Sequence, residues 1–298
     1  MTPQCETVET EHFGAIPVRK RNCPLCNCDN QIVPASRYSY QSWTIKECSV
    51  CGFVYIDRAP TYEIQFTVMA WERTTKVEEQ RRVEIRPISY TASKRTRFRK
   101  NLLPKRIMLD YIAGRIQGGN VIDLGCGDGH SMMGFPPSFI PFGVEISSKL
   151  AASADSAFAP RGGYAINAAC VEGLRQFPES FFAAASLRSY LEHEADPLPV
   201  LKGLQRVLAP GAFAVVKVPN YRSLNRIVMG RRWCGFRYPD HLNYFSPNTL
   251  RAMANKAGFE TSFGLTGCLP TSDNMWAVLT KCGDTRSGRL EHQPDRHG

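Results

Sequence analysis

A short glycine-rich turn directly after an apolar run constrains this chain more than any other feature. In VIDLGCGDGH, residues 121–130, Gly125, Gly127 and Gly129 stand at alternate positions behind Asp123. Glycine adopts positive φ angles easily and lets a ligand come close to the backbone. The turn therefore indicates a ligand site at the end of a strand.

The glycine turn opens a region in which strand-like apolar runs alternate with helical stretches. The runs are NVIDL, PFGVEI, YAIN, FAAASL and GAFAVVKVP, followed by FETSFGL and MWAVLTK, which are typical of a closing antiparallel hairpin. Alternation of this kind predicts an α/β fold with a parallel sheet covered by helices. Ligands of such sheets bind at the carboxyl ends of the strands.

Two common phosphate-binding patterns do not fit the turn. A dinucleotide fingerprint requires G-x-G-x-x-G, but His130 occupies the position of its third glycine. A phosphate loop requires Gly-Lys-Ser/Thr after its glycines, and none follows here.

The pattern D-x-G-x-G-x-G after a first strand resembles motif I of the class I S-adenosylmethionine (SAM)-dependent methyltransferases, over roughly residues 105–281. The resemblance implies a Rossmann-like, seven-stranded sheet whose glycine turn packs against the cofactor. It also implies that Asp123 accepts a hydrogen bond from the cofactor's amino group, directly or through water. Glu145, 20 residues after Gly125, would accept hydrogen bonds from both ribose hydroxyls.

This chain departs from the family pattern at the third strand, where many members have an acid that meets the adenine. Cys170 or Val171 stands near that position, so backbone and apolar contacts would hold the base. The full cofactor-binding set implied by the resemblance is Asp123, Gly125, Cys126, Gly127, Gly129, Glu145, Ile146, Cys170 and Val171.

Cysteines cluster near the start of the chain. CPLCNC and CSVCG form a C-x2-C pair, a gap of 21 residues and a second C-x2-C pair. This spacing predicts a structural zinc ribbon with four cysteine ligands: Cys23, Cys26, Cys48 and Cys51. Cys28 is a spare that could replace Cys26 as a ligand. The alternative is a set of buried thiols or a redox pair, although no βαβ context surrounds these cysteines.

Two further resemblances bear on the methyl acceptor. SYLEHEADPLPVLKGLQRVLAPG is similar to a block of the ubiquinone-pathway O-methyltransferases. In some of those relatives a Glu three residues before the Glu-His pair helps to hold magnesium; Ser189 stands there, and zinc is the only metal expected. A zinc ribbon with a later RRWCGFRYPDHLNYF segment resembles a bacterial group whose genes often lie among those for glycans, lipids or secondary metabolites. A small-molecule or carrier-linked acceptor, methylated on oxygen, is the resulting expectation.

Methyl transfer to oxygen or nitrogen is an in-line displacement, so the protein mainly positions the acceptor and removes its proton. His193 and His241 are the candidate bases, because a neutral imidazole can take a proton near pH 7. The alternative for His193 is a hydrogen bond to a helix end or to the cofactor-site backbone. Residues expected to bind the acceptor are Glu192, Arg232, Trp233, Arg237 and Tyr244, with packing of that loop onto the sheet as the alternative.

Charge and composition narrow the partners. With 37 basic and 27 acidic residues the net charge is +10, which favours an anionic partner. No apolar stretch reaches about 18 residues, so no membrane span is expected. The first residues do not form a secretory signal, and clustered cysteines fit a reducing compartment, so we expect a cytoplasmic protein.

The domain organisation follows from these segments. We expect a flexible N-terminus (1–20), the zinc ribbon (21–58), a helical connector (59–104), the methyltransferase domain (105–281) and a disordered tail (282–298). Two other functions stay open: an RNA-modifying methyltransferase that grips nucleic acid with the ribbon and the basic connector, and a non-catalytic binding module. Oligomeric state is not predictable from the sequence.

Overall fold

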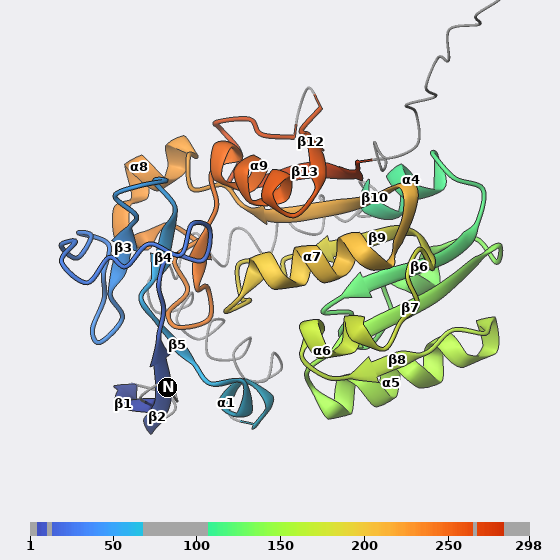
Figure 1. Cartoon of the computed structure of the whole chain (residues 1–298), viewed down its shortest axis with the longest axis horizontal. Coiled ribbons are helices and arrows are strands. Elements are labelled where there is room, and N and C mark those ends of the chain that lie inside the picture. Colours follow the sequence, from blue (N-terminus) through green and yellow to red (C-terminus); the bar gives the residue numbers. More distant parts are fainter. Residues whose placement is uncertain (1–4, 11–13, 68–106, 265–266, 283–298) are drawn as a thin grey trace, which may run out of the picture.

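The computed structural model describes residues 5–10, 14–67, 107–264 and 267–282. Its central feature is a seven-stranded sheet with the order β12-β13-β10-β9-β6-β7-β8 (Figure 1). The strands are β6 (Gly119–Leu124), β7 (Phe139–Glu145), β8 (Ala165–Asn167), β9 (Phe182–Arg188), β10 (Leu208–Pro219), β12 (Phe259–Ser262) and β13 (Asn274–Lys281). The five strands from β6 to β10 run parallel, while β13 pairs antiparallel with both β10 and β12. The predicted α/β fold is confirmed.

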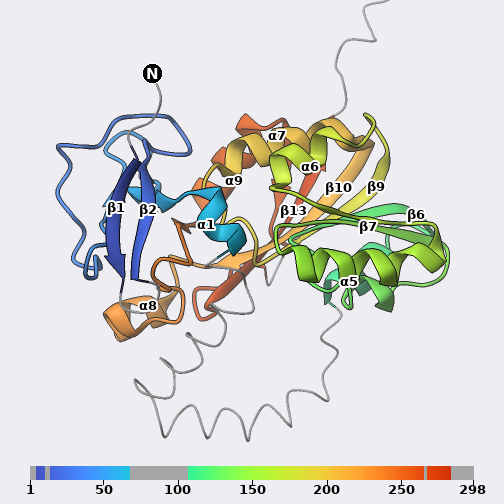
Figure 2. The same cartoon turned by 90° about the horizontal axis from the view of Figure 1, so that it is seen from below.

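Helices cover both faces of this sheet. The α-helices are α4 (Ile107–Ala113), α5 (Ser148–Phe158), α6 (Cys170–Arg175), α7 (Pro197–Val207), α8 (Leu224–Met229) and α9 (Pro247–Lys256). Short 3-10 turns are η1 (Met132–Gly134), η2 (Ala159–Arg161) and η3 (Gly230–Arg232). Figure 2 shows α6, α7 and α9 on one face and α5 on the other.

The alternation of side chains along β6 explains why both faces are apolar. Ile122 and Leu124 pack in one core cluster with Leu201 of α7, whereas Val121 packs in a second cluster with Phe158 of α5. A strand buried on both faces reads as a nearly continuous apolar run. That is the pattern the sequence shows before the glycine turn.

The N-terminal part forms two small sheets beside the main one. One sheet has the order β1-β2-β5, from β1 (Cys5–Thr10), β2 (Gly14–Lys20) and β5 (Arg58–Pro60). The other has the order β11-β4-β3, from β3 (Ile45–Glu47), β4 (Val54–Ile56) and β11 (Asn243–Tyr244). Helix α1 (Tyr62–Thr67) follows β5. Strand β11 comes from the C-terminal half of the chain, so β3 and β4 share their sheet with the segment between β10 and α9.

The expectation of a flexible N-terminus over residues 1–20 is wrong for the described part of that range. Strands β1 and β2 form an antiparallel hairpin, and β2 continues the pairing to β5. Val8, Ile16 and Val18 are buried in a cluster with Trp43 and Trp233. Burial of these alternating apolar residues explains why the segment is ordered.

Two of the expected segments lie largely outside the described residues. Beyond β5 and α1, the predicted connector lies outside the described residues, as do residues 283–298 of the predicted tail. Within the described part of the chain, no helix combines the length and apolar character that a bilayer crossing requires.

Candidate functional site

The glycine turn follows β6 at the carboxyl end of the central strands. Gly125, Gly127 and Gly129 have φ angles of +71°, +58° and +76°. All three lie in the left-handed region, where side chains other than glycine are strained. Backbone conformation alone therefore accounts for the alternate glycines.

The three glycines differ in how much space a side chain would have at each position. A Cβ on Gly125 would lie 2.9 Å from the ring of Tyr190, and one on Gly129 would lie 2.7 Å from the ring of Phe158. A Cβ on Gly127 would meet nothing within 4 Å. Gly125 and Gly129 are thus required for packing, whereas Gly127 borders open space into which a ligand can fit.

The two kinds of glycine predict different consequences for alanine. Gly127→Ala adds left-handed strain of about 1–2 kcal/mol and places a methyl group in the open space. Gly129→Ala adds the same strain plus overpacking against Phe158, a further loss of about 1–3 kcal/mol. We expect Gly127→Ala to bind S-adenosylhomocysteine about tenfold or more weakly than wild type. We also expect it to lose less stability than Gly129→Ala. Denaturant unfolding and calorimetry measure the two effects; unchanged affinity in Gly127→Ala would contradict a cofactor at this turn.

Glu145 joins the glycine turn to the start of α5. The residue is 6% exposed, and its carboxylate accepts from two backbone N–H groups, of Gly127 at 2.9 Å and of Ser147 at 2.9 Å. Each carboxylate oxygen can accept more than one hydrogen bond. Glu145 can therefore hold the turn in shape and still accept from two ribose hydroxyls.

Asp123 is the penultimate residue of β6, and its side chain is buried. One carboxylate oxygen accepts a hydrogen bond from the Ser131 hydroxyl at 3.3 Å. Burial raises the pKa of Asp123 to about 6, although Ser186, Arg188 and Ser131 act against this rise. The carboxyl group is therefore poised to change charge slightly below neutral pH.

This raised pKa predicts a pH-dependent cofactor affinity. Below about pH 6 Asp123 holds a proton, and above it the carboxylate can accept from the cofactor's ammonium group. Affinity for S-adenosylhomocysteine should therefore weaken as the pH falls through 6, by at most about tenfold per pH unit. Calorimetry between pH 5 and 8 measures this, with Asp123→Asn expected to bind weakly and with a flat profile. Equal slopes in both proteins would assign the titration to another group.

The other predicted cofactor residues divide into buried and accessible ones. Cys126 and Cys170 are 5% and 4% exposed, and the Cys126 thiol packs so closely on Gly143 that a Cβ there would lie 2.5 Å from its sulfur. Ile146 and Val171 are half-buried. Cys126 and Cys170 thus belong to the buried packing of this region, whereas Ile146 and Val171 have surface available for a ligand.

Tyr190 is a residue that the sequence analysis missed. Its ring lies against Gly125, and its hydroxyl donates to Glu194, which also accepts from the hydroxyl of Tyr62 in α1. Its position in the sequence, two residues after the end of β9, could have marked it as a residue near the ligand site. Tyr190 connects the glycine turn to the loop that holds the candidate bases.

Glu192, His193 and His241 come together near the carboxyl end of β9. Their side-chain nitrogen and oxygen atoms lie within 4.8 Å of one another, close enough to share a proton or an ion. The two imidazole centroids are 4.6 Å apart. His193 Nδ1 lies 3.4 Å from Asp240, which in turn pairs with Arg237 at 2.7 Å. His241 Nδ1 lies 2.8 Å from the carbonyl oxygen of Gly235.

Electrostatics distinguishes the two histidines. Burial alone would lower the pKa of His193, but Asp240 and Glu192 outweigh it and raise that pKa above its ordinary value. Burial and the neighbouring His193 and Arg237 hold the pKa of His241 well below its ordinary value. His241 is therefore neutral at physiological pH, and His193 is the imidazole that can gain and lose a proton there.

The acceptor-binding expectation needs correction at two aromatic residues. Trp233 is 1% exposed and its indole N–H donates to Asp273 at 2.7 Å. Tyr244 is 2% exposed and packs in the same cluster as Trp233. No ring face is left for a ligand, so both residues serve packing. Arg237 orients Asp240, and Arg232 is exposed.

The loop that carries His193 is hydrogen-bonded to the segment that forms β11. Strand β11 pairs with β4, and Leu242 N–H donates to the carbonyl of Glu192 at 2.7 Å. The Asn243 amide donates to the carbonyls of Leu191 and Glu194 at 2.9 and 2.6 Å. The small sheet of β3, β4 and β11 therefore fixes the position of the candidate bases.

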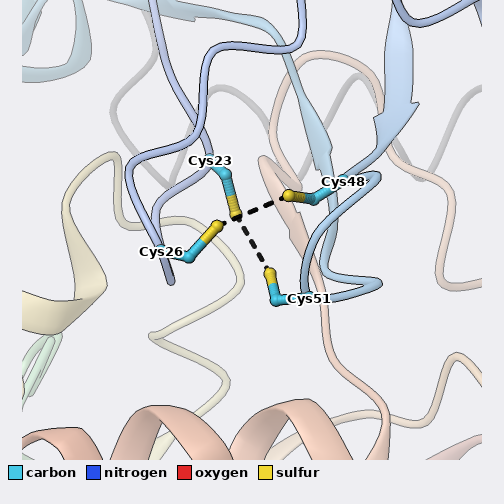
Figure 3. A group of neighbouring side chains, drawn as sticks. All are labelled: Cys23, Cys26, Cys48 and Cys51. Atoms are coloured by element: carbon cyan, nitrogen blue, oxygen red, sulfur yellow. Dashed lines mark hydrogen bonds between the residues drawn. The ribbon is translucent and has the colours of Figure 1, made fainter.

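Figure 3 shows Cys23, Cys26, Cys48 and Cys51 with their sulfurs converging. Cys23 and Cys51 are 3.5 Å apart between sulfurs, as are Cys26 and Cys48. A tetrahedral zinc site with Zn–S bonds of about 2.3 Å requires sulfurs about 3.8 Å apart, so the four residues fit zinc. The thiol of Cys28 lies instead near the Asp29 carbonyl, and Cys28 is not part of the group.

Comparison with known proteins identifies the family. A family model described as a methyltransferase domain matches residues 94–262, which is more than half of the chain. The chain belongs to this methyltransferase family. It is a methyltransferase with an α/β fold, and the glycine turn with Glu145 lies where such a fold binds its ligand.

Solved structures similar to this methyltransferase are remote. The YcgJ protein from Bacillus subtilis is 19% identical with a TM-score of 0.40, over 49% of this chain and 63% of that one. A possible histamine N-methyltransferase from Thermotoga maritima is 19% identical with a TM-score of 0.44, over 74% and 99%. A SAM-dependent methyltransferase from Archaeoglobus fulgidus is 16% identical with a TM-score of 0.44, over 64% and 100%. No curated protein shows significant similarity.

Proposed function

We propose that this methyltransferase transfers a methyl group from SAM to a hydroxyl of a small-molecule or carrier-linked acceptor. The observation that carries the proposal is the His193–Asp240 pair, 3.4 Å apart, in which His193 follows three residues after Tyr190, the residue that packs against Gly125. A histidine whose Nδ1 faces a carboxylate presents Nε2 as a proton acceptor, as in other oriented imidazole bases. Such a base is needed for a hydroxyl and is less important for an acceptor that carries no acidic proton.

The proposed reaction is a single displacement. The acceptor oxygen forms a bond to the methyl carbon while the sulfur–methyl bond breaks, and Nε2 of His193 takes the hydroxyl proton. The products are the methyl ether, S-adenosylhomocysteine and a protonated His193, whose charge Asp240 stabilises. Positioning of the two substrates supplies most of the acceleration in such reactions.

Cofactor binding is assigned to the two buried acids and the turn between them. In this proposal Glu145 accepts from the ribose hydroxyls, Asp123 accepts from the amino group, and the open side of Gly127 receives the cofactor. Ile146 and Val171 would contact the adenine. The support lies in the acids' burial, the paired N–H groups on Glu145 and the open space at Gly127.

A zinc ion at the four cysteines is the second part of the proposal. Four thiolates leave no open position on the ion, so it would stabilise the ribbon and take no part in chemistry. The ribbon would thereby hold β4, β11 and the His193 loop in place. Thiolate ligands persist in reducing surroundings, which agrees with the expected cytoplasmic location.

The cofactor assignment is tested by titrating the purified protein with S-adenosylhomocysteine, alongside Glu145→Ala. We expect the variant to bind about 30-fold more weakly, because losing a charged hydrogen-bond partner costs about 2 kcal/mol. Glu145→Gln, which keeps one acceptor oxygen, should bind with intermediate affinity.

Two outcomes would contradict the proposal. Failure of the folded wild type to bind S-adenosylhomocysteine would favour a non-catalytic binding module. Equal affinity of wild type and Glu145→Ala, with both proteins folded by circular dichroism, would place the cofactor elsewhere. Once binding is established, a panel of hydroxylated acceptors tests the methyl transfer itself.

A further inference from the structure

Two cationic residues lie side by side where neighbouring parallel strands of the main sheet end. Arg188 is the last residue of β9, and Lys217 lies two residues before the end of β10. They are paired in register, and Lys217 pairs on its other side with Trp276 of β13. Paired residues of adjacent strands project from the same face of a sheet. Arg188, Lys217 and Trp276 therefore form one row across the sheet.

The row lies on the face of the sheet that also carries Asp123. Ser186, two residues before Arg188, pairs with Asp123 across β9 and β6. Side chains two residues apart on a strand share a face, so Asp123, Ser186 and Arg188 project the same way. The sheet order runs from β10 through β9 to β6, and strands about 4.8 Å apart place Lys217 about 10 Å from β6. Lys217 is thus two strands away from the strand that carries the glycine turn.

Both cations are accessible and have donors to spare. Arg188 is exposed and Lys217 is half-buried. Among the described residues, neither side chain forms an ion pair or a hydrogen bond. The Lys217 ammonium lies 5.7 Å from the centre of the Trp276 ring, a contact that is weaker than pairing with an anion. Two neighbouring positive charges, one of them half-buried, are costly unless an anion lies between them.

The candidate bases lie close to this pair of cations. Glu192 interacts electrostatically with both Lys217 and His193, and a carboxylate oxygen of Glu192 lies within 4.8 Å of a His193 ring nitrogen. Burial lowers the pKa of Lys217, and Arg188 lowers it too, although Glu192 and Cys234 act against this. Glu192 therefore offsets the charge of Lys217 only in part, and it connects the cations to the base.

We propose that Arg188 and Lys217 together bind an anionic group of the methyl acceptor, a carboxylate or a phosphate. The assignment to the acceptor rests on the proposed function, whereas anion binding by the two cations can be measured without it. A guanidinium offers paired donors and an ammonium offers three, so both can donate to the oxygens of one group. The partly exposed ring of Trp276 would border the organic part of the acceptor. The acceptor hydroxyl can then lie toward Glu192 and His193.

The test is competitive acetylation of the full-length protein loaded with S-adenosylhomocysteine, with inorganic phosphate as the probe. Acetic anhydride reacts with neutral amines, and the lowered pKa of Lys217 makes this side chain reactive. Phosphate at about ten times its Kd should slow acetylation of Lys217 about tenfold, because the occupied site does not react. Lys202, exposed on α7 across the sheet (Figure 2), is the internal control and should react at an unchanged rate. Peptide mass spectrometry measures both rates.

Variants of Arg188 test whether the two cations act together. Arg188→Met should weaken phosphate binding, read from the protection of Lys217, by about tenfold or more, the scale for losing a charged donor. Arg188→Lys keeps the charge and should retain most of the protection. Each variant is compared with itself without phosphate, so a changed basal reactivity does not enter. Arg175→Met, on the exposed side of α6, is the matched control and should behave as wild type does. Acetate, used in parallel, distinguishes a carboxylate site from a phosphate site.

The outcomes are distinct from those for the cofactor site. Wild type that binds S-adenosylhomocysteine, but whose Lys217 is protected by neither phosphate nor acetate, would overturn this inference alone. Protection that Arg188→Met leaves unchanged would overturn it too. Phosphate protection in a protein that does not bind S-adenosylhomocysteine would contradict the proposed function and leave the anion site standing.

The carboxylate of the cofactor is the competing source of the anion. We expect Lys217→Met to bind S-adenosylhomocysteine as wild type does, because Lys217 is two strands away from β6. If this variant bound it about tenfold more weakly, and S-adenosylhomocysteine alone protected Lys217, the anion would be that of the cofactor and the assignment to the acceptor would be wrong. Much stronger protection by a single-stranded RNA oligonucleotide, with a steep salt dependence, would overturn the inference in favour of nucleic acid.

Discussion

Replacing Cys48 with serine is expected to remove one equivalent of zinc and to lower the melting temperature by about 10 °C or more. Structural zinc sites contribute on the order of 10 kcal/mol to small domains, and losing even about 4 kcal/mol shifts the melting temperature by about 10 °C in a chain of this size. Cys48 and Cys23 also belong to the main core cluster, so disruption of the knuckle reaches the central fold. Elemental analysis and differential scanning calorimetry measure the two effects.

Cys28→Ser is the matched control for that experiment. Cys28 lies outside the four-cysteine group although it is only two residues from Cys26. The control should keep its zinc and its melting temperature. If Cys28→Ser lost the ion and Cys48→Ser kept it, the ligand set would be wrong. Loss of zinc without any change in stability would remove the structural role from the proposal.

His193→Gln is expected to reduce kcat by about 10²- to 10⁴-fold, the usual contribution of a general base. Affinity for S-adenosylhomocysteine should stay close to that of wild type, because His193 lies in the loop after β9 and not in the glycine turn. The pH profile supplies a second signature. Asp240 and Glu192 raise the pKa of His193, so the wild-type rate should increase with pH through a value above 6.5, where the imidazole loses its proton.

Asp240→Asn distinguishes a base from a merely structural histidine. Without the carboxylate the pKa of His193 should fall, and the rising limb of the pH profile should move to lower pH. The maximal rate should also fall, since the imidazole loses its orienting partner. An Asp240→Asn profile that coincides with that of wild type, or His193→Gln with full activity, would assign the proton to another group.

The backbone of the glycine turn was largely predictable from the sequence because its determinants are local. Three glycines at alternate positions require a particular backbone, and Glu145 ends the next parallel strand, β7, after a connection that contains only the short 3-10 turn η1. The structure gives all three glycines positive φ angles and links Glu145 to Gly127 directly. The cysteine spacing is local in the same sense, since each C-x2-C pair forms one knuckle.

The acceptor side was less predictable because burial there depends on distant residues. Trp233 and Tyr244 suggested ring stacking, but Trp233 is fixed by Asp273, 40 residues further along the chain. The pairing of β11 with β4 joins segments about 190 residues apart, as shown by Tyr244 facing Val54. The periodicity of the sequence does not predict this long-range pairing. The order of residues 5–10 and 14–20 likewise depends on Trp43, Trp233 and β5, which the short runs CETVET and GAIPVRK do not specify.

The shared sheet of β3, β4 and β11 also limits when and where the ribbon can fold. Its middle strand, β4, has both neighbours only after Asn243 and Tyr244 have left the ribosome. During synthesis the zinc knuckles can form early, but one edge of β4 remains unpaired until β11, in the last third of the chain, has been made. An unpaired strand edge invites association with other chains. The ribbon should therefore not behave as a transferable cassette: excised alone or fused to a different catalytic domain, it would expose that edge, whereas a circular permutant that keeps β11 beside β4 would not.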